Sequence, residues 1–366
     1  MNGSLPLPLH EFHQKLGARF AALHGAETVA DYGDPLGEHA ALRAGAGVFD
    51  LSFRSRLCLL GTDRVRFLHG QVTNDVKNLR AGEGAYAALV TAKGRMESDL
   101  NVYALQDELL LDFEPGLNAK VSQRLEKFIV ADDVQVAEVS PHYGLLSVQG
   151  PEAEAVVRHL GRFHELPAKP FHFIRHADES FGEVYLMNQP RLGFAGLDLF
   201  VPTTALQAAA EQLIAAARSV GGQPCGWTAF DTARIEAGIP RFGVDMDETN
   251  IPLECGIEAC AVSYRKGCYI GQEVLNRIHS IGHVNRELRG LRLADDLPAL
   301  PTKGDKLLHA GREVGSVTSA VRSPALKANL ALGYVRREAN AIGTDLTLQS
   351  TWGESQARIV ELPFVK

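Results

Sequence analysis

The sequence predicts an α+β fold in which two related lobes are followed by a small β-barrel. One observation predicts the lobes: a strand, a glycine turn and a helix follow one another twice, with the two glycines 89 positions apart. A second observation predicts the barrel, because from about residue 286 short apolar runs are separated by glycines and polar turns. We therefore expect a body over residues 1–285, with lobe boundaries near residues 50 and 141, and a barrel domain over residues 286–366.

The repeated pattern begins at residues 57–60 and again at residues 145–149, each an apolar run typical of a strand. Gly61 and Gly150 follow as turn residues, and a helix with an acidic residue in its first turn is expected after each. Pro151 is expected at the first helical position, where its missing N–H would have no partner within the helix.

The apolar spacing predicts further elements between and after the repeats. Strands are expected over residues 85–90, 101–105 and 108–113, and helices over 117–129 and 205–220. We expect Thr203 or Thr204 to cap the start of the last helix, and Gly221 and Gly222 to end it.

Composition is ordinary for a soluble globular protein, with 45% hydrophobic and 22% charged residues among 366. The net charge of −7 gives no sign of the basic face typical of nucleic-acid-binding proteins, so no direct nucleic-acid partner is expected. The N-terminal residues lack a signal-peptide pattern, and no apolar run is long enough to span a membrane. Five cysteines, an odd number, fit a reducing compartment. We therefore expect a cytoplasmic protein without membrane contact.

The densest motifs lie between residues 234 and 273. Arg-Ile-Glu-Ala-Gly at 234–238 and Asp-Met-Asp-Glu-Thr at 245–249 resemble the glycine-cleavage T-protein, or aminomethyltransferase, family. Residues 46–105 carry the same resemblance, so it covers most of the chain. It implies the T-protein folate-binding fold, with two interleaved α+β lobes and a C-terminal β-barrel. It also implies that tetrahydrofolate or another folate binds in the space between the lobes and the barrel.

Three side chains stand at positions that bind or act on folate in that family. The resemblance implies that Glu236 accepts the paired donors of the pterin ring and that Arg265 binds the carboxylate tail. It implies that Asp99 is catalytic, stabilising positive charge or moving a proton near the folate nitrogens. Without the resemblance, the same residues can be interpreted as having structural roles only. In these, Glu236 is a solvated residue, Arg265 forms a surface salt bridge, and Asp99 ends a turn before the strand at Leu100.

Residues 266–273 form an octapeptide that is similar to the signature of the YgfZ branch of this family, which includes a mitochondrial iron–sulfur assembly factor. The motif residues are Lys266, Gly267, Cys268, Tyr269, Gly271, Gln272 and Glu273. We expect Cys268 to be an accessible functional thiol and a second catalytic candidate. Arg265 and Lys266 place positive charge beside it, and the helix expected over 272–279 begins just beyond it.

The other cysteines predict no metal site. Cys255 and Cys260 lie among apolar residues and are expected to be small buried side chains. The spacing of Cys255, Cys260 and Cys268 fits neither a ferredoxin run nor a zinc pair. An iron–sulfur cluster carried on these three cysteines is the least favoured of three functional hypotheses.

The favoured hypothesis is a tetrahydrofolate-binding, YgfZ-like factor that assembles or maintains iron–sulfur proteins, with only an indirect link to tRNA modification. Its partners would be folate and iron–sulfur client proteins or their assembly machinery. The alternative is an aminomethyltransferase of the glycine cleavage type. The T-protein family has two adjacent aspartates where this chain has Ser98 and Asp99, and His-Met where it has Phe53-Arg54. These departures favour the first hypothesis and predict that the purified protein lacks aminomethyltransferase activity.

Overall fold

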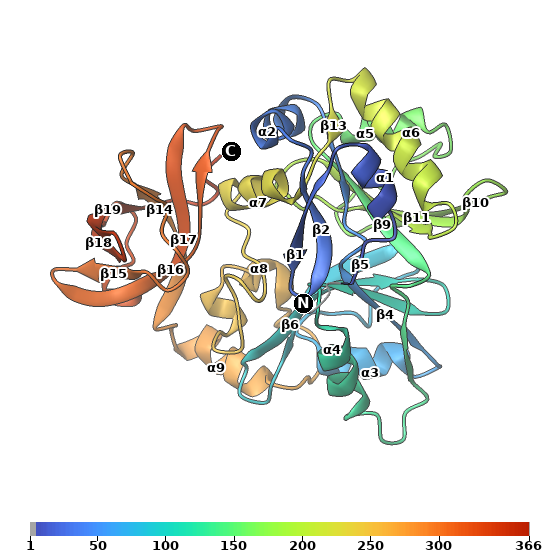
Figure 1. Cartoon of the computed structure of the whole chain (residues 1–366). Coiled ribbons are helices and arrows are strands. Elements are labelled where there is room, and N and C mark those ends of the chain that lie inside the picture. Colours follow the sequence, from blue (N-terminus) through green and yellow to red (C-terminus); the bar gives the residue numbers. More distant parts are fainter. Residues whose placement is uncertain (1–4, 366) are drawn as a thin grey trace. The chain divides into compact units, whose positions relative to one another are not determined.

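The computed structural model describes residues 5–365, which divide into two compact units. Unit 1 comprises the described residues up to Ala87 together with Asp99–Phe230. Unit 2 comprises Ala88–Ser98 and the described residues from Asp231 onward. The chain is α+β with a closed barrel near its C-terminus, as the sequence predicts (Figure 1).

Unit 1 contains a six-stranded sheet with the order β10-β11-β12-β9-β3-β13, in which only the β13–β3 pair among the pairings described is parallel. Its strands are β3 (Gly47–Asp50), β9 (Tyr143–Gln149), β10 (Phe173–Asp178), β11 (Gly182–Asn188), β12 (Gly196–Pro202) and β13 (Gln223–Pro224). Helices α5 (Ala153–His159) and α6 (Leu206–Ser219) pack on this sheet and on each other (Figure 1). Leu206, Leu213 and Ala217 are fully buried on the inner face of α6.

A five-stranded sheet has the order β5-β6-β7-β4-β8. Its strands are β4 (Ser55–Leu60), β5 (Glu83–Val90), β6 (Met96–Ala104), β7 (Leu109–Phe113) and β8 (Gln135–Glu138), and the hairpin of β1 (Arg19–Leu23) and β2 (Ala26–Asp31) is separate. The remaining helices up to residue 236 are α1 (His10–Lys15), α2 (Pro35–Ala44), α3 (Arg64–Gln71), α4 (Asn118–Glu126) and α7 (Trp227–Glu236).

The predicted repeat is present, because β4 leads through a glycine into α3 and β9 leads through a glycine into α5. Gly61 and Gly150 both adopt positive φ, at 97° and 128°, a backbone conformation that L-residues with a Cβ rarely adopt. An added Cβ at Gly61 would lie 2.1 Å from the carbonyl oxygen of Asp133, so this turn needs glycine for space as well.

Two predicted helix starts are wrong. Pro151 is not the first helical residue, because α5 begins at Ala153 after a turn in which the Ala153 amide donates to the Gly150 carbonyl. The start of α6 has no side-chain cap, so neither Thr203 nor Thr204 caps it. A turn precedes this helix too, since the Ala205 amide donates to the Pro202 carbonyl at 2.9 Å.

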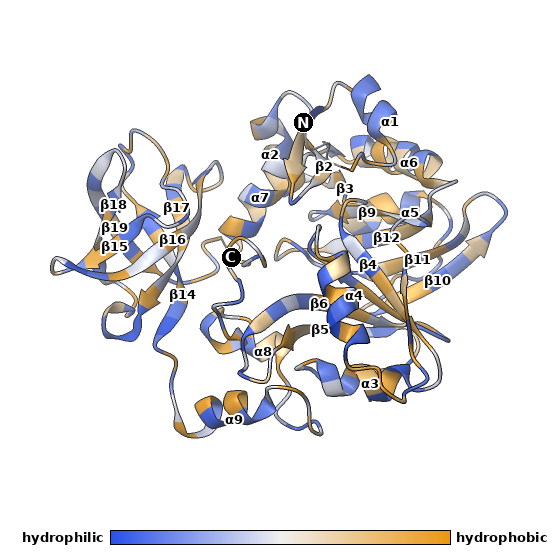
Figure 2. Cartoon of the chain, turned by 60° about the horizontal axis from the view of Figure 1, so that its bottom comes forward, coloured by the Kyte–Doolittle hydropathy of each residue, from blue (hydrophilic) through white to orange (hydrophobic). Residues whose placement is uncertain are grey.

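Unit 2 contains a closed barrel with the order β14-β17-β16-β15-β18-β19. Three short helices precede the barrel: η1 (Pro252–Glu254), α8 (Glu258–Ala261) and α9 (Gln272–Ile281). The barrel strands are β14 (Arg286–Leu293), β15 (Lys306–His309), β16 (Arg312–Ser323), β17 (Ala328–Arg336), β18 (Asp345–Ser350) and β19 (Gly353–Val360), and η2 (Arg337–Ala339) follows β17. Leu291, Leu307 and Leu348 fill the barrel interior. Helix α9 carries both hydrophobic and hydrophilic residues (Figure 2), and only Leu275 of it is fully buried.

Candidate functional site

Asp99 lies inside strand β6, so the interpretation of this residue as the end of a turn before Leu100 is wrong. Its side chain keeps partial solvent access, and the Tyr86 hydroxyl on neighbouring β5 donates to Asp99 Oδ2 at 2.9 Å. Ser98, which replaces the first aspartate of the family pair, is fully buried. A strand rather than a mobile turn therefore holds the candidate catalytic carboxylate.

The surroundings of Asp99 raise the pKa of its carboxyl to about 6. The main cause is desolvation by the protein, and the negative charge of Glu114 adds to it. The hydrogen bond from Tyr86 and the positive charge of Arg54 lower the pKa in part. A carboxyl with a pKa near neutrality can both donate and accept a proton under ordinary conditions, which is what a general acid–base group requires.

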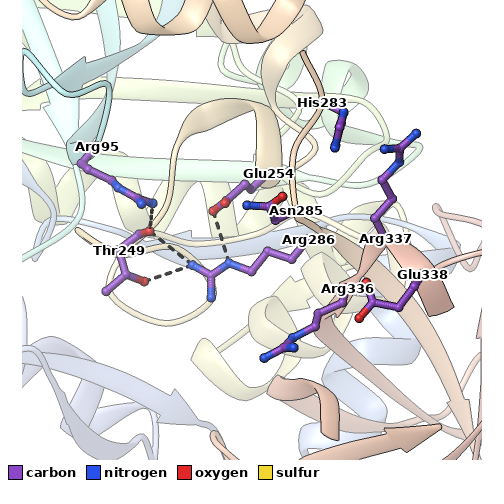
Figure 3. A pocket seen from close by; sticks show the side chains of 9 residues that line it. All are labelled: Arg95, Thr249, Glu254, His283, Asn285, Arg286, Arg336, Arg337 and Glu338. Carbon is purple, nitrogen blue, oxygen red and sulfur yellow. Dashed lines mark hydrogen bonds and ion pairs between the residues drawn. The ribbon is translucent and has the colours of Figure 1, made fainter. Parts of the chain in front are cut away.

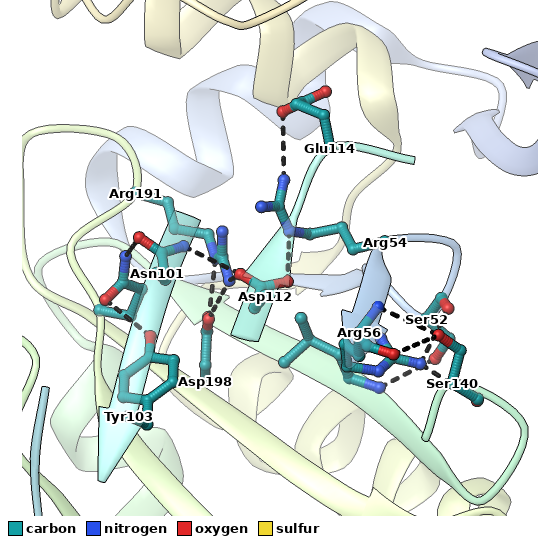
Figure 4. A network of polar contacts seen from close by, with 12 residues as sticks. Ser52, Arg54, Arg56, Asn101, Tyr103, Asp112, Glu114, Ser140, Arg191 and Asp198 are labelled. Carbon is teal, nitrogen blue, oxygen red and sulfur yellow. Dashed lines mark hydrogen bonds and ion pairs between the residues drawn. The ribbon is translucent and has the colours of Figure 1, made fainter. Parts of the chain in front are cut away.

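A buried charged network lies in unit 1 and joins Asp112 on β7, the neighbour of β6, to residues of two loops and to Asp198 on β12 of the other sheet (Figure 4). Arg54 joins two carboxylates, with Nε 2.7 Å from Asp112 Oδ1 and Nη1 3.1 Å from Glu114 Oε1. Arg191 joins Asp112 to Asp198 at 2.8 and 2.7 Å. Although burial opposes ionisation, the two guanidinium groups hold the pKa of Asp112 well below its usual range. Asp112 therefore stays charged, whereas the Asp99 carboxyl has a pKa close to neutrality.

Sequence reasoning missed this network as well as Tyr86. The network joins residues between 54 and 198, which only the strand register brings together. The sequence did contain a signal for it, because Asp112 and Asp198 are each the single acidic residue in an otherwise apolar strand. An ionisable group at such a position is rarely buried without a partner.

In unit 2, the two T-protein-like motifs are bonded to each other. Arg234 of the first motif is 1% exposed and forms a buried ion pair with Asp245 of the second. Asp245 also accepts from the hydroxyls of Thr318 and Ser319 on β16, at 2.6 and 2.7 Å. These motif residues therefore tie helix α7 and the loop after it to the barrel.

Glu236, the predicted pterin-binding residue, is the last residue of α7 and is fully buried. It is not the solvated residue that its flanking sequence suggests. Its Oε1 accepts from the Ser323 hydroxyl at 2.5 Å, and its backbone carbonyl accepts from the amides of Phe364 and Val365. Neutral donors of this kind can hold a buried carboxylate in one orientation.

Arg265, Lys266 and Tyr269 lie on the loop between α8 and α9. Arg265 is exposed, and its side chain makes no hydrogen bond or ion pair within residues 5–365, so the alternative interpretation of this residue as part of a surface salt bridge is wrong. Lys266 is buried, with Nζ 4.8 Å from the centre of the Tyr269 ring. The Tyr269 hydroxyl is also buried and has no hydrogen-bond partner in the described chain. An unpaired guanidinium and an unpaired buried hydroxyl thus lie four residues apart.

Cys268 is exposed on the same loop, as predicted. Cys255 is buried, also as predicted: it accepts from the Tyr334 hydroxyl at 3.1 Å and donates to the Ile251 carbonyl at 3.3 Å. The prediction for Cys260 is wrong, because this residue is exposed. The short helix α8 spans only Glu258–Ala261 and buries only Ala261, leaving Cys260 on the outer side.

The loop ends at Gly271, which precedes α9 with φ 85°. An added Cβ would lie 2.6 Å from the Thr91 carbonyl oxygen, so glycine is required for this close approach. Gln272 and Glu273 form the first turn of α9, and the helix predicted over 272–279 is confirmed as Gln272–Ile281.

The predicted site residues are divided between the units: Asp99 belongs to unit 1, whereas Glu236, Arg265 and Cys268 belong to unit 2. Among residues 5–365, no group of three or more His, Cys, Asp or Glu side chains is placed so that it could hold a metal ion. Over the same described range, no helix is both long and apolar enough to cross a membrane.

Family models, related sequences and a solved structure together match nearly the whole chain. Residues 9–266 match the GCVT N-terminal domain, and residues 286–366 match the glycine cleavage T-protein C-terminal barrel domain. The chain is 30% identical to an aminomethyltransferase of Shouchella clausii (strain KSM-K16), covering 99% of this chain and 98% of that protein. It is 31% identical to an aminomethyltransferase of Symbiobacterium thermophilum, covering 100% and 99% of the two chains. The crystal structure of glycine cleavage system aminomethyltransferase T from Bartonella henselae superposes with a TM-score of 0.89 at 25% identity, covering 99% and 98%. The predicted fold is therefore confirmed.

Proposed function

Because the chain belongs to the glycine cleavage T-protein family, which uses tetrahydrofolate, we propose that it is a tetrahydrofolate-dependent aminomethyl transferase with Asp99 as its proton-transfer residue. The observation that carries the proposal is the similarity to aminomethyltransferases over the full length of the chain; the place of Asp99 within strand β6, where burial raises its pKa to about 6, supports the choice of residue. Similarity over the full length to aminomethyltransferases supports this function over the iron–sulfur role that the sequence alone favours.

The residues of unit 2 fit a folate ligand. Glu236 is a buried carboxylate able to accept the paired donors of a pterin ring. The Arg265 side chain has no partner within residues 5–365, so its guanidinium fork is available to bind the carboxylate tail. The buried Tyr269 hydroxyl also lacks a partner within the described residues, and a polar ligand on this loop would satisfy it.

Tetrahydrofolate, when bound, supplies amine nitrogens that accept a one-carbon unit. Asp99 would act on the protons of this exchange, taking one at its carboxylate oxygen and returning it to the departing amine. The hydrogen bond from Tyr86 to Oδ2 holds the carboxyl in one orientation, and Arg54 limits the rise of its pKa. Both protonation states are then populated near neutral pH, which favours proton transfer in either direction.

A second candidate is a YgfZ-like role in the assembly or maintenance of iron–sulfur proteins. The exposure of Cys268 within its octapeptide supports it, because aminomethyl transfer gives this thiol no task. Ser98 supports it too, since a hydroxyl replaces one carboxylate of the family pair. In this role tetrahydrofolate would still bind, while Cys268 would act on iron–sulfur client proteins or their assembly machinery.

One assay separates the two candidates: tetrahydrofolate-dependent release of ammonia from an aminomethyl-lipoyl carrier by the purified protein. The proposal predicts turnover that falls by about 100-fold or more in Asp99→Asn. It predicts little change in Asp107→Asn, which removes an exposed carboxylate from the β6–β7 turn. No turnover by the folded parent protein would reject the proposal. Restoration of iron–sulfur enzyme activity in a deletion strain by the parent gene, but not by Cys268→Ala, would then establish the second candidate.

A further inference from the structure

Unit 2 contains a basic pocket of about 990 Å³ that is lined by none of the predicted site residues Asp99, Glu236, Arg265 and Cys268, although Thr249 ends the second T-protein-like motif (Figure 3). Its lining residues are Arg95, Thr249, Glu254, His283, Asn285, Arg286, Arg336, Arg337 and Glu338. All of them belong to unit 2, and they come from the β5–β6 hairpin, η1 and the loop before it, the linker after α9, strands β14 and β17, and η2. The four arginines and two glutamates leave a formal surplus of two positive charges, in a chain whose net charge is −7.

Two of these arginines converge on one oxygen atom. Arg95 Nη1 donates to the carbonyl of Thr249, and Arg286 Nη2 donates to the same carbonyl at 3.2 Å (Figure 3). Guanidinium groups held this close repel each other. Glu254, with Oε2 3.3 Å from Arg286 Nε, and the negative charge of Asp247 both act on Arg286, whereas Arg95 has no ion-pair partner among the described residues. An anion in the pocket would relieve the remaining repulsion.

The other two arginines, Arg336 and Arg337, have no side-chain partner among residues 5–365. They are exposed at the end of β17 and the start of η2. Their backbone is fixed, because the Arg337 amide donates to the Asn285 carbonyl at 3.0 Å. Two free guanidinium groups therefore stand on an ordered turn at the wall of the pocket.

We infer that this pocket binds a phosphate-bearing anion. A guanidinium group presents a planar fork of donors that matches phosphate oxygens, and arginines are enriched where such groups are recognised. A phosphate monoester carries about −1.5 to −2 charges at pH 7 and would neutralise the surplus of the pocket, whereas a single carboxylate would leave part of it. The ligand is free phosphate or pyrophosphate, or the phosphate groups of a nucleotide. This site does not depend on the proposed transfer reaction.

The test is isothermal titration calorimetry of the whole purified protein with pyrophosphate, ADP and citrate in turn, in a low-salt buffer. The informative variant is Arg336→Ala/Arg337→Ala, which removes two exposed, unpaired side chains. The matched control is Arg312→Ala/Arg358→Ala, which removes two exposed arginines from β16 and β19, outside the pocket lining. Circular dichroism and the melting temperature would show that both variants fold.

We expect pyrophosphate or ADP to bind the parent and the control alike and to bind the pocket variant about tenfold or more weakly. Equal affinity for pyrophosphate and ADP would identify the phosphate groups as the ligand, and tighter binding of ADP would identify a nucleotide. The inference is wrong if neither phosphate ligand binds the parent, if the pocket variant binds as tightly as the control, or if citrate binds more tightly than both.

Discussion

At the scale of single residues, Asp99 shows how a strand environment turns a common side chain into a candidate acid–base group. Its carboxyl is desolvated and faces the negative charge of Glu114, while the nearby Asp112 is held ionised by two guanidinium groups. Two carboxylates in one sheet thus have pKa values on opposite sides of the ordinary range. Such separation is typical of sites in which acids and bases have distinct tasks.

The pKa of Asp99 predicts a pH dependence of stability that does not rely on any ligand. Because the folded-state pKa of about 6 exceeds the ordinary 3.8, the native state binds more protons between these values. The free energy of unfolding should therefore fall as pH rises from 3.8 through 6. Asp99→Asn should lack this loss and be more stable than the parent at pH 7.5 by about 1 kcal/mol, a value reduced for partial solvent access.

Urea unfolding of Asp99→Asn and of the parent at pH 5 and pH 7.5 measures this difference. Asp107→Asn, an exposed carboxylate on the same hairpin, is the control and should follow the parent. A stability difference between Asp99→Asn and the parent that stays constant with pH would contradict the assignment of a raised pKa.

Cysteine exposure predicts an order of alkylation. Iodoacetamide should modify Cys268 first and Cys260 second. Both residues are exposed, but desolvation raises the pKa of the Cys260 thiol and so lowers its thiolate fraction. Cys58, Cys225 and Cys255 are buried and should react only after unfolding. Peptide mass spectrometry of a time course would give the order. As a control, Cys260→Ala should leave the rate of alkylation at Cys268 unchanged. Modification of Cys260 before Cys268 would contradict the prediction that Cys268 is the most reactive thiol.

At the scale of elements, Gly271 sets the start of α9 and the end of the cysteine loop. Gly271→Ala should lower the free energy of unfolding by about 2–3 kcal/mol, because it combines a positive φ with a clash against a backbone carbonyl. Gly256→Ala is the matched control: its φ is 74°, but an added Cβ would meet nothing within 4 Å. It should cost about 1 kcal/mol. Equal losses in the two variants would show that the contact with Thr91 contributes nothing.

Elements were predictable from the sequence where apolar periodicity was long, as in α6 and α9, and less so at their ends. The helix start predicted at Pro151 and the helix cap predicted at Thr203 or Thr204 are wrong for the same physical reason. In both places a tight turn precedes the helix and supplies backbone carbonyls, so neither a proline nor a hydroxyl is needed there. Local capping rules do not include such turns.

The candidate site residues were proposed only where they lie within short sequence motifs. Glu236, Arg265, Cys268 and Asp99 were predicted as site residues because their motifs resemble those of a family. The chain of ion pairs from Arg54 through Asp112 to Arg191 was not found, since it depends on which strands are neighbours. The basic pocket was missed for the same reason, as its arginines lie between positions 95 and 337.

At the scale of the whole molecule, the full-length match to the T-protein family makes tetrahydrofolate binding the claim on which both candidate functions rest. Calorimetric titration of the intact protein with tetrahydrofolate tests it most directly. The account predicts one binding site in the parent and an affinity lower by about tenfold or more in Glu236→Gln, which loses the charge offered to the pterin donors. Ser323→Ala removes the hydrogen bond to Glu236 but keeps the carboxylate, so it should bind folate far better than Glu236→Gln. The absence of binding by the folded parent, or equal affinity in Glu236→Gln, would contradict the account.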